Sequence, residues 1–268
     1  LRHAGHRVGL IGTIQAMIED EVLPTSNTTP DIIVLQQMLA EMRTRGMDTV
    51  VMEVSSHALA LGRVAGIEFD TAVFTNLTQD HLDFHKTMEN YARAKAHLFE
   101  LVSAPGAKEG KTAVLNADDA ASETMRAYTR CPIITYGVDH PADLTAQDVQ
   151  LACDGMELTL MHGGKRLFHL HTGITGLFNV HNVLAAVGAS LAEQVAATDI
   201  AAALTAFTGV PGRFELVREG QDFAVIVDYA HTPDGMENVL RTARAVTKGH
   251  IIAVFGCGGD RDRTKRPI

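Results

Sequence analysis

The stretch FDTAVFTNLTQDHLDFH, Phe69 to His85, decides how the rest of the chain is interpreted. It begins with a short apolar run, Phe69–Thr75, of the kind that forms a buried strand. The loop after this run holds four potential ligands or acid–base groups within six residues: Asp80, His81, Asp83 and His85. This loop is compatible with a metal site, with an acid–base cluster and with a solvated polar loop.

The same apolar pattern recurs along the chain and alternates with helical patterns. Helices are predicted at Pro30–Arg45 and at Met88–Val102. The apolar runs are nearly continuous, as in strands that are covered on both faces: Arg7–Ile11, Asp48–Val54, Phe69–Thr75, Thr112–Leu115 and Ile133–Tyr136. The alternation predicts an α/β fold with a central, mostly parallel sheet and flanking helices.

The second half of the chain changes pattern. A hairpin is predicted within Val149–His171, and two helices follow it, Val180–Gln194 and Thr198–Phe207. Glycine and proline in GVPGRFE (Gly209–Glu215) are typical of a linker, so we expect one domain over 1–209 and the beginning of another over 210–268. The second unit is predicted as strand, helix, strand: Phe223–Asp228, Pro233–Ala245 and His250–Phe255.

Composition limits the class of protein. The 268 residues are 46% hydrophobic, enough for a sizeable core, and the net charge of −9 argues against nucleic acid as the main partner. Three cysteines without a CxxC motif fit a reducing compartment. The sequence has no apolar run of about 18 residues and no signal peptide, so we expect a cytoplasmic protein with no membrane partner.

Glu53 closes the apolar run TVVMEV. A carboxylate at the end of a buried parallel strand lies where open α/β sheets bind ligands, and we expect the Asp80–His85 loop at the same edge of the sheet. The loop lacks a third ligand and the H-E-x-x-H spacing of zinc sites. A carboxylate with one imidazole is closer to a magnesium site completed by phosphate, although a surface acid and a polar loop explain the pattern equally well.

Lys95 lies on an apolar helix stripe. In MENYARAKAHLFEL it shares that stripe with Met88, Tyr91 and Leu98. Such a lysine either extends its amine to solvent or keeps a desolvated amine with a lowered pKa. A neutral amine of the second kind can react with CO₂ and become a carbamate that binds metal.

Two further segments carry polar groups at element ends. In DYAHTPDGMENVL, Asp228 follows a strand, and Thr232 and Pro233 begin a helix whose N-terminus could bind phosphate or ribose. The segment GCGGDRDRTKR contains Arg261 in a basic cluster, which suits carboxylate or phosphate capture. A plain helix start and a solvated basic face are the competing interpretations.

Taken together, these segments and their neighbours resemble the Mur ligases, in the order in which that family carries them. EVSSHAL, DYAHTPD and GGDRD resemble the branch that adds the third residue to the peptidoglycan stem peptide. The segments are SNTTP (Ser26–Pro30), MEVSSHAL (Met52–Leu59), FTNLTQDHLDFH (Phe74–His85), YARAK (Tyr91–Lys95), FNVHNVLAA (Phe178–Ala186), PGRFE (Pro211–Glu215), DYAHTPD (Asp228–Asp234) and GCGGDRDRTKRP (Gly256–Pro267).

The resemblance implies an ATP-dependent amide ligase of peptidoglycan biosynthesis. The D-glutamyl carboxylate of UDP-N-acetylmuramoyl-L-alanyl-D-glutamate attacks ATP to give an acyl phosphate, and the amine of diaminopimelate or lysine then displaces phosphate. The implied domains are a central ATP-binding domain without its first strand and phosphate loop (1–209), and the truncated start of a Rossmann-like C-terminal domain (210–268). Because the G-x-x-G-K-S/T loop is absent, we expect this chain alone to be nearly inactive.

The resemblance also implies roles for individual residues. Glu53, His81 and Lys95 match the catalytic positions, with Glu53 and His81 as Mg²⁺ ligands and Lys95 as a carbamylated lysine that supports a metal. Arg261 matches the arginine that binds the incoming amino acid. Positions that hold the muramoyl dipeptide are Asn27, Thr28, Thr29, Ser55 and Arg63. Positions around ATP are Asn179, Asn182, Arg213, Asp228 and His231.

Three alternatives stay open at this point. The first is a sister ligase such as folylpolyglutamate synthase, against which EVSSHAL argues. The second is a non-catalytic relative that binds the substrate without turning it over, and the third is a zinc hydrolase built on DHLDFH. The sequence settles neither the third amino acid nor the oligomeric state, for which we expect a monomer.

Overall fold

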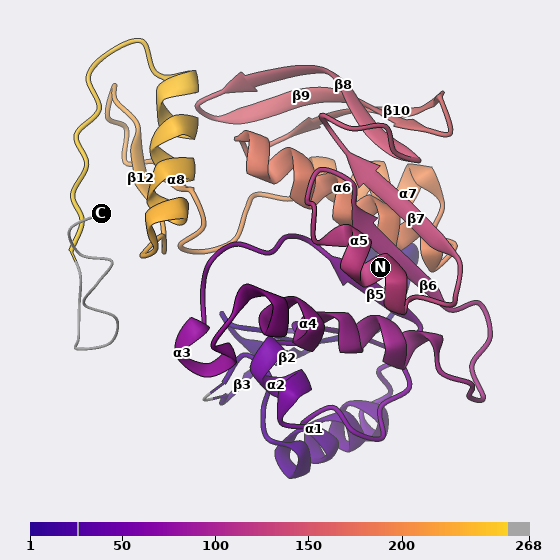
Figure 1. Cartoon of the computed structure of the whole chain (residues 1–268). Coiled ribbons are helices and arrows are strands. Elements are labelled where there is room, and N and C mark those ends of the chain that lie inside the picture. Colours follow the sequence, from indigo (N-terminus) through magenta and orange to yellow (C-terminus); the bar gives the residue numbers. More distant parts are fainter. Residues whose placement is uncertain (26, 257–268) are drawn as a thin grey trace.

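The computed structural model describes residues 1–25 and 27–256, so Arg261 lies outside the described part. Figure 1 shows an α/β architecture in which helices surround two sheets, with a smaller unit beside them at the carboxyl end. The strand orders are β3-β2-β1-β4, β10-β9-β8-β7-β6-β5 and β11-β12. The predicted fold class is confirmed. None of the described helices combines the length and apolar content that a membrane crossing requires.

The first sheet is small and covered by one helix. Its strands are β1 (Val8–Ile11), β2 (Ala16–Ile18), β3 (Glu21–Leu23) and β4 (Thr49–Met52). β1, β2 and β3 form an antiparallel meander. α1 (Ile32–Thr44) then leads from β3 to β4, which pairs in parallel with β1. Leu35 and Met42 of α1 are fully buried in the cluster that includes Ile11.

The second sheet has helices on both faces. Its parallel part is β5 (Thr71–Phe74), β6 (Thr112–Asn116), β7 (Ile133–Gly137) and the start of β8 (Leu144–Ala152). Every residue of β6 is buried. Val114 packs with α6 (Leu177–Ala192), and its neighbours Ala113 and Leu115 pack with α4 (Met88–Ser103) and α5 (Ser122–Tyr128). Alternate residues of a strand point to opposite faces, so the continuous apolar run is explained.

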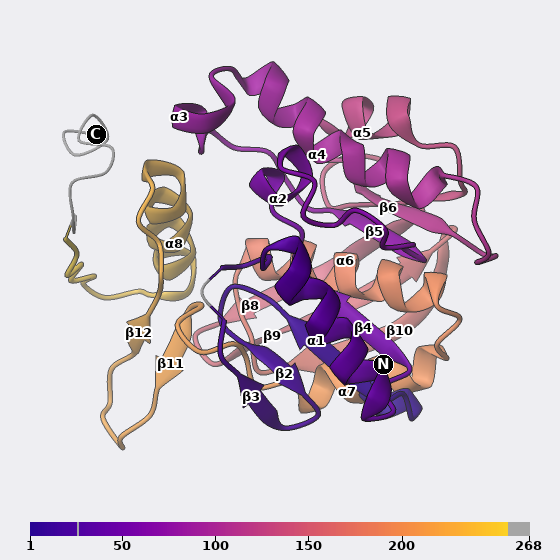
Figure 2. The ribbon, with the colours of Figure 1, turned by 90° about the horizontal axis from the view of Figure 1, so that it is seen from below.

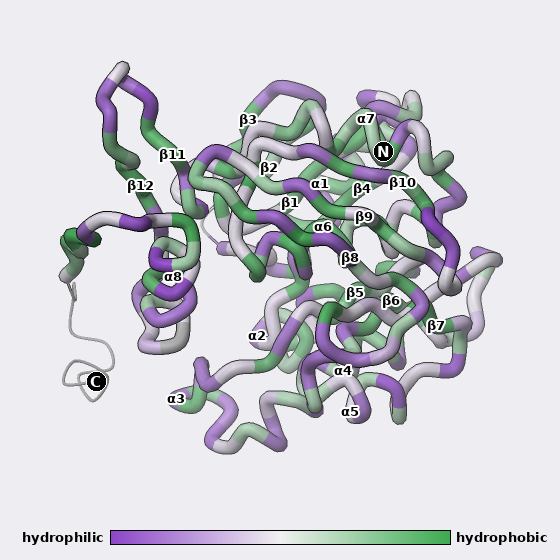
Figure 3. Tube along the Cα trace, turned by 90° about the horizontal axis from the view of Figure 1, so that it is seen from above, coloured by the Kyte–Doolittle hydropathy of each residue, from purple (hydrophilic) through white to green (hydrophobic). Residues whose placement is uncertain are grey.

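The other end of this sheet is antiparallel. β9 (Gly155–His162) pairs with β8 and with β10 (Lys165–Thr172), which confirms the predicted hairpin. Figure 3 shows hydrophilic and hydrophobic stretches alternating along these strands, and β9 alternates buried with more exposed residues. One face is covered by α6 and α7 (Ala197–Ala206), as alternation of this kind requires.

The carboxyl-terminal unit is only partly formed as predicted. β11 (Glu215–Val217) pairs with β12 (Val225–Val227), and α8 (Pro233–Val246) begins at Pro233 with the Thr232 side chain as its cap. The strand predicted at His250–Phe255 is wrong within the described residues. It has no neighbouring strand there to pair its backbone, and Val254 is 95% exposed.

Two other expectations need correction. β4 and β5 do not lie in one sheet: in the described chain β4 pairs only with β1, and β5 pairs only with β6. The short helix α2 (Ser56–Ala60), which follows β4, packs instead on α4, which follows the loop after β5 (Figure 2). The first helix begins at Ile32 rather than Pro30, because Asp31 has an extended backbone as the residue before the helix.

Candidate active site

Glu53 directly follows β4, where the loop after β1 holds its carboxylate. Its backbone N–H donates to the carbonyl oxygen of Ile11 at 2.8 Å. Oε2 accepts hydrogen bonds from the Thr13 amide at 3.2 Å and from the Thr13 hydroxyl. In the described chain no donor is bonded to Oε1, and a Cβ atom on Gly12 would stand 3.0 Å from it. One carboxylate oxygen is therefore fixed, and the other is available to a cation.

Three of the predicted dipeptide contacts gather beside Glu53. Thr29 is 1% exposed, and its hydroxyl donates to the Glu53 carbonyl at 2.8 Å while accepting from the Ser55 amide at 3.0 Å. The Arg63 guanidinium donates to the Thr29 carbonyl at 3.0 Å and pairs with Asp31 at 2.9 Å. Thr29, Ser55 and Arg63 therefore form one hydrogen-bonded unit around the end of β4.

The remaining dipeptide candidates are less closely joined to this unit. The Thr28 hydroxyl lies 3.0 Å from the Thr13 hydroxyl, which connects Thr28 to Glu53. Asn27 is exposed, and its carbonyl accepts from the Thr25 hydroxyl at 2.8 Å. Arg261 lies outside the described residues, so its predicted role stays a prediction.

His81 stands at the start of the short helix α3 (Leu82–His85), in the left-handed backbone region with φ of 56°. Its amide donates to the Asp80 carboxylate at 2.8 Å. The His81 ring lies 4.8 Å from the His57 ring of α2 and 5.9 Å from the Tyr91 ring of α4. His57 thus bridges the segment that follows Glu53 and the loop that carries His81.

His85 binds this loop to both neighbouring helices. It is 6% exposed, Nε2 lies 2.9 Å from the Ser56 hydroxyl, and the ring stacks on Tyr91 at 5.0 Å. Burial, together with the nearby His57 and His81 rings, lowers the pKa of His85. The two helices that flank the loop are therefore held by one neutral imidazole.

Lys95 is half-buried on α4, with Nζ 5.2 Å from the centroid of the Tyr91 ring. In the part of the chain that the structure describes, its amine has no hydrogen bond or ion pair. Burial lowers the pKa of Lys95, and the carboxylates of Asp119 and Asp80 oppose that shift. Burial also raises the pKa of Tyr91 to about 12, so its phenol stays neutral beside the amine. This environment favours the desolvated amine over a solvated one.

Two acids that were not predicted from the sequence, Asp118 and Asp119, lie just after β6. Asp119 accepts from the Leu77 amide at 2.7 Å and so fixes the loop that leads to His81. Asp118 accepts from the Val138 amide at 2.6 Å, and from His140 Nδ1 and His181 Nε2, both at 2.9 Å. Burial alone would raise the pKa of Asp118, but these donors lower it well below its usual range. The position after a buried strand, the criterion that selected Glu53, identifies both acids.

Asp118 also fixes the start of α6, where two ATP candidates lie. Asn179 Nδ2 donates to the Thr175 carbonyl at 2.8 Å, and Asn182 Nδ2 donates to Asn179 Oδ1 at 3.1 Å. His181, bonded to Asp118, stands between them in the helix. The first turns of α6 are therefore tied to the carboxyl ends of β6 and β7.

The other ATP candidates surround Tyr229. Arg213 stacks on its ring at 5.0 Å, and His231 Nδ1 lies 2.9 Å from its carbonyl oxygen. Asp228 accepts from the Phe214 amide at 2.7 Å, and the Phe214 ring lies 5.8 Å from Phe178 of α6. The five ATP candidates thus gather at the junction of α6 and β12. No hydrogen bond or ring contact between described residues joins them to the Glu53 group.

The described residues contain no group of three or more His, Cys, Asp or Glu placed to hold a metal ion. A structural or catalytic zinc site uses three or four such ligands, so the zinc hydrolase loses its support. Mg²⁺ usually keeps several waters and takes one or two protein ligands together with substrate phosphates. The open Oε1 of Glu53 fits an ion of that kind.

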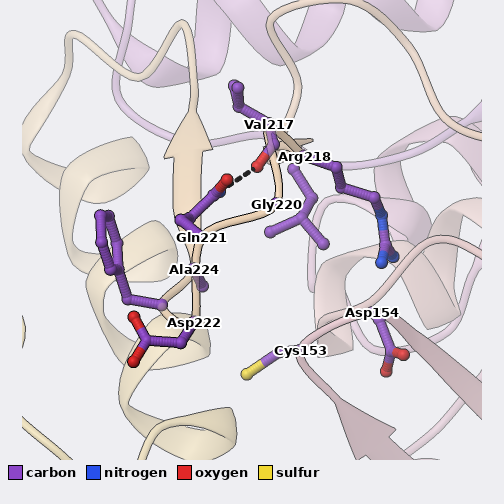
Figure 4. Close-up of a pocket in the computed structure, with 10 residues that line it drawn as sticks. Cys153, Asp154, Val217, Arg218, Gly220, Gln221, Asp222 and Ala224 are labelled. Atoms are coloured by element: carbon purple, nitrogen blue, oxygen red, sulfur yellow. Dashed lines mark hydrogen bonds between the residues drawn. The ribbon is translucent and has the colours of Figure 1, made fainter.

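Two cavities lie beside the carboxyl-terminal unit. The larger has a volume of about 510 Å³. Figure 4 shows it between the β8–β9 turn, which carries Cys153, and the β11–β12 hairpin, which carries Arg218. Within that hairpin, Gln221 donates to the Val217 carbonyl at 2.7 Å. None of the candidate site residues lines it. The smaller, about 320 Å³, is lined in part by Arg213 and so adjoins the ATP candidates.

Comparisons with known proteins agree with the fold. A family model described as the Mur ligase middle domain matches residues 1–190, and one described as the Mur ligase glutamate ligase domain matches residues 212–268. UDP-N-acetylmuramoyl-L-alanyl-D-glutamate–2,6-diaminopimelate ligases from Bacillus cereus and Listeria innocua are 50% and 48% identical, over 100% of this chain and 55% and 54% of theirs. The chain spans about half the length of these curated relatives.

Solved structures give the same result. The structure of a UDP-N-acetylmuramoyl-L-alanyl-D-glutamate–2,6-diaminopimelate ligase superposes with a TM-score of 0.77 at 33% identity, covering 99% of this chain and 54% of that one. The apo form of L. casei FPGS shares the fold, with a TM-score of 0.69 at 19% identity over 93% of this chain and 67% of that one. The matched domains and the identities lead to one conclusion: the chain belongs to the Mur ligase family.

Proposed function

We propose that the full-length protein joins diaminopimelate to UDP-N-acetylmuramoyl-L-alanyl-D-glutamate, with ATP hydrolysis, in peptidoglycan synthesis. The identity of about half of all residues to ligases named for this reaction supports the substrates. The observation that carries the proposal is the joined unit of Glu53, Thr29, Ser55 and Arg63 beside a loop with His81. The choice of diaminopimelate over lysine rests on the names of the relatives.

In this proposal the unit around Glu53 receives the dipeptide. Arg63 and Ser55 contact its carboxylate end, and Asn27, Thr28 and Thr29 contact the remainder. The D-glutamyl carboxylate attacks the γ-phosphorus of ATP, the bond to ADP breaks, and an acyl phosphate forms. The amine of the diamino acid then attacks the acyl carbon and expels phosphate. Glu53 and His81 would hold Mg²⁺, which supplies charge neutralisation for the transferring phosphoryl group.

Lys95 has the properties that a carbamylation site needs. Only the neutral amine reacts with CO₂, and burial favours the neutral form. The amine adds to the carbon of CO₂ and loses a proton, which turns a potential cation into an anion. We propose that this carbamate, rather than an ammonium, faces the phosphate and metal region in the working protein.

The ATP candidates fit a second lobe of the same site. We propose that Asn179 and Asn182 contact the adenine side, and that Arg213, Asp228 and His231 contact the ribose and phosphates. Arg261 would bind the carboxylate of the incoming amino acid. We also propose that residues 1–209 belong to the ATP-binding domain and 210–268 to the next domain. No role for nucleic acid or membrane is part of the proposal, and a cytoplasmic monomer is its simplest form.

The test uses the natural full-length protein with ATP, Mg²⁺ and pairs of acceptor and amine. UDP-muramoyl dipeptide with diaminopimelate should release phosphate and form the tripeptide product. Folate with glutamate should not, because EVSSHAL belongs to the muramoyl branch. ATP hydrolysis that responds to folate alone would support the sister ligase, and dipeptide binding without turnover would support the non-catalytic relative. Lysine in place of diaminopimelate measures the choice of the third residue.

A further inference from the structure

A chain of hydroxyl groups runs from the candidate dipeptide region to the candidate metal ligand. Thr13 lies in the loop after β1, and its hydroxyl donates to Glu53 Oε2. The Thr13 amide donates to the same oxygen at 3.2 Å. On its other side, the Thr13 hydroxyl lies 3.0 Å from the hydroxyl of Thr28. Thr13 is therefore the one described residue bonded to both Glu53 and Thr28.

The direction of these hydrogen bonds follows from the number of protons. A hydroxyl carries one proton and can accept through two lone pairs. Because a carboxylate only accepts, Thr13 must give its proton to Glu53. The bond between the two threonines then requires Thr28 to donate to Thr13. The Thr28 proton is committed inward, and its oxygen is left free to accept from a ligand.

Space around Glu53 reinforces this arrangement. A Cβ atom on Gly12 would approach Oε1 to 3.0 Å, so the carboxylate lies against a position that a glycine leaves free of a side chain. The Glu53 backbone is fixed independently by the Ile11 and Thr29 hydrogen bonds, each 2.8 Å long. Only the carboxylate orientation depends on the Thr13 hydroxyl.

We propose that Thr13 is a positioning residue that aims the Glu53 carboxylate and couples it to occupancy of the dipeptide site through Thr28. This inference rests on the proposed function, because it takes Glu53 as a metal ligand and Thr28 as a dipeptide contact. An amide N–H of the dipeptide that donates to Thr28 strengthens the chain of donors toward Glu53. A ligand that only accepts at Thr28 would reverse the Thr28 proton and deprive Thr13 of its donor.

The experiment compares Thr13→Val, which keeps shape and removes the hydroxyl, with Thr13→Ser, which keeps the hydroxyl. Mn²⁺ serves as the probe in the full-length protein with a non-hydrolysable ATP analogue, and electron paramagnetic resonance reports free Mn²⁺. Each variant is titrated with and without UDP-muramoyl dipeptide. Thr44→Val, the same change on α1 far from Glu53, is the matched control. Melting curves confirm that each variant is folded.

In wild type, UDP-muramoyl dipeptide should increase the affinity for Mn²⁺. Thr13→Val should weaken Mn²⁺ binding about 10-fold, the usual effect of losing a partner of a metal ligand, and should abolish this increase. The Mn²⁺ affinity of Thr13→Ser should stay within about 3-fold of wild type. Thr28→Val should keep most of the Mn²⁺ affinity, since Thr13 still donates to Glu53, but its affinity should no longer increase with dipeptide. Folded Thr13→Val that matches wild type in both titrations overturns the coupling. Wild type that binds no Mn²⁺ under these conditions instead overturns the proposed function.

Discussion

Asp118 is the acid whose replacement should damage the fold most, and its geometry sets the size of the effect. Its side chain is 9% exposed. Oδ1 accepts from the His140 amide at 2.8 Å and His140 Nδ1 at 2.9 Å, and Oδ2 accepts from the Val138 amide at 2.6 Å and His181 Nε2 at 2.9 Å. Asp118→Asn keeps the shape but turns one acceptor into an NH₂ group that must face backbone N–H donors.

The cost can be worked from those partners. A hydrogen bond to a charged group contributes about 1.5–3 kcal/mol, and a buried donor left without a partner costs about 1–3 kcal/mol. The amide retains one acceptor, so we expect a total loss of about 3 kcal/mol rather than the sum over all donors. For a chain of this size that loss lowers the melting temperature by about 6–12 °C.

Thermal and urea unfolding at pH 7 measure this loss, with exposed Asp139→Asn as the matched control. Because donors lower the folded pKa of Asp118 below the ordinary 3.8, its contribution is complete above pH 3.8 and disappears as pH falls toward the folded value. The difference between wild type and Asp118→Asn should therefore shrink in acid. A loss within about 0.5 kcal/mol, the range of ordinary surface changes, would refute the reasoning.

Three further predictions concern the Glu53 and Lys95 region. Lys95→Met should stabilise the chain by about 1 kcal/mol at pH 7 in CO₂-free buffer, because it removes a half-buried unpaired charge. This stabilisation should shrink as pH rises toward 10.5, since the Lys95 amine loses its proton at a lower pH in the folded chain than in the unfolded chain. His85→Phe should cost about 2 kcal/mol in urea unfolding, because the Ser56 hydroxyl, in a residue 2% exposed, loses its partner. The same change at His97, whose side chain is 45% exposed, is the control, and equal stability of the two variants would contradict this prediction. Gly12→Ala should weaken Mn²⁺ binding about 10-fold by displacing the Glu53 carboxylate, and unchanged affinity would show that the carboxylate has room to move.

The continuous apolar runs allowed most of the parallel strands to be predicted, because burial on both faces leaves a clear pattern. β6, buried at every position, is the clearest case. The three-residue strands β2 and β3 were missed because they are shorter than any periodicity that a sequence window can detect. The strand expected at His250–Phe255 shows the opposite limit, since β-propensity without a pairing partner in the described chain leaves the backbone extended and exposed.

The candidate site was predictable where chemistry follows directly from strand ends, as for Glu53. It was not predictable where contacts depend on tertiary placement. His57, His85 and Tyr91 meet only because α2 packs on α4, and no spacing in the sequence encodes that packing. Thr13 lies 40 residues from Glu53 in sequence, so its hydrogen bond was equally hidden.

Transfer of oxygen from substrate to phosphate tests the central claim most directly. UDP-muramoyl dipeptide labelled with ¹⁸O in both D-glutamyl carboxylate oxygens is incubated with the full-length protein, ATP, Mg²⁺ and diaminopimelate, and the released phosphate is analysed by mass spectrometry. An acyl phosphate route predicts one ¹⁸O atom in each phosphate, because the carboxylate oxygen leaves with phosphorus when the amine attacks carbon. Tripeptide formed with unlabelled phosphate, or phosphate released without any tripeptide, would contradict the account.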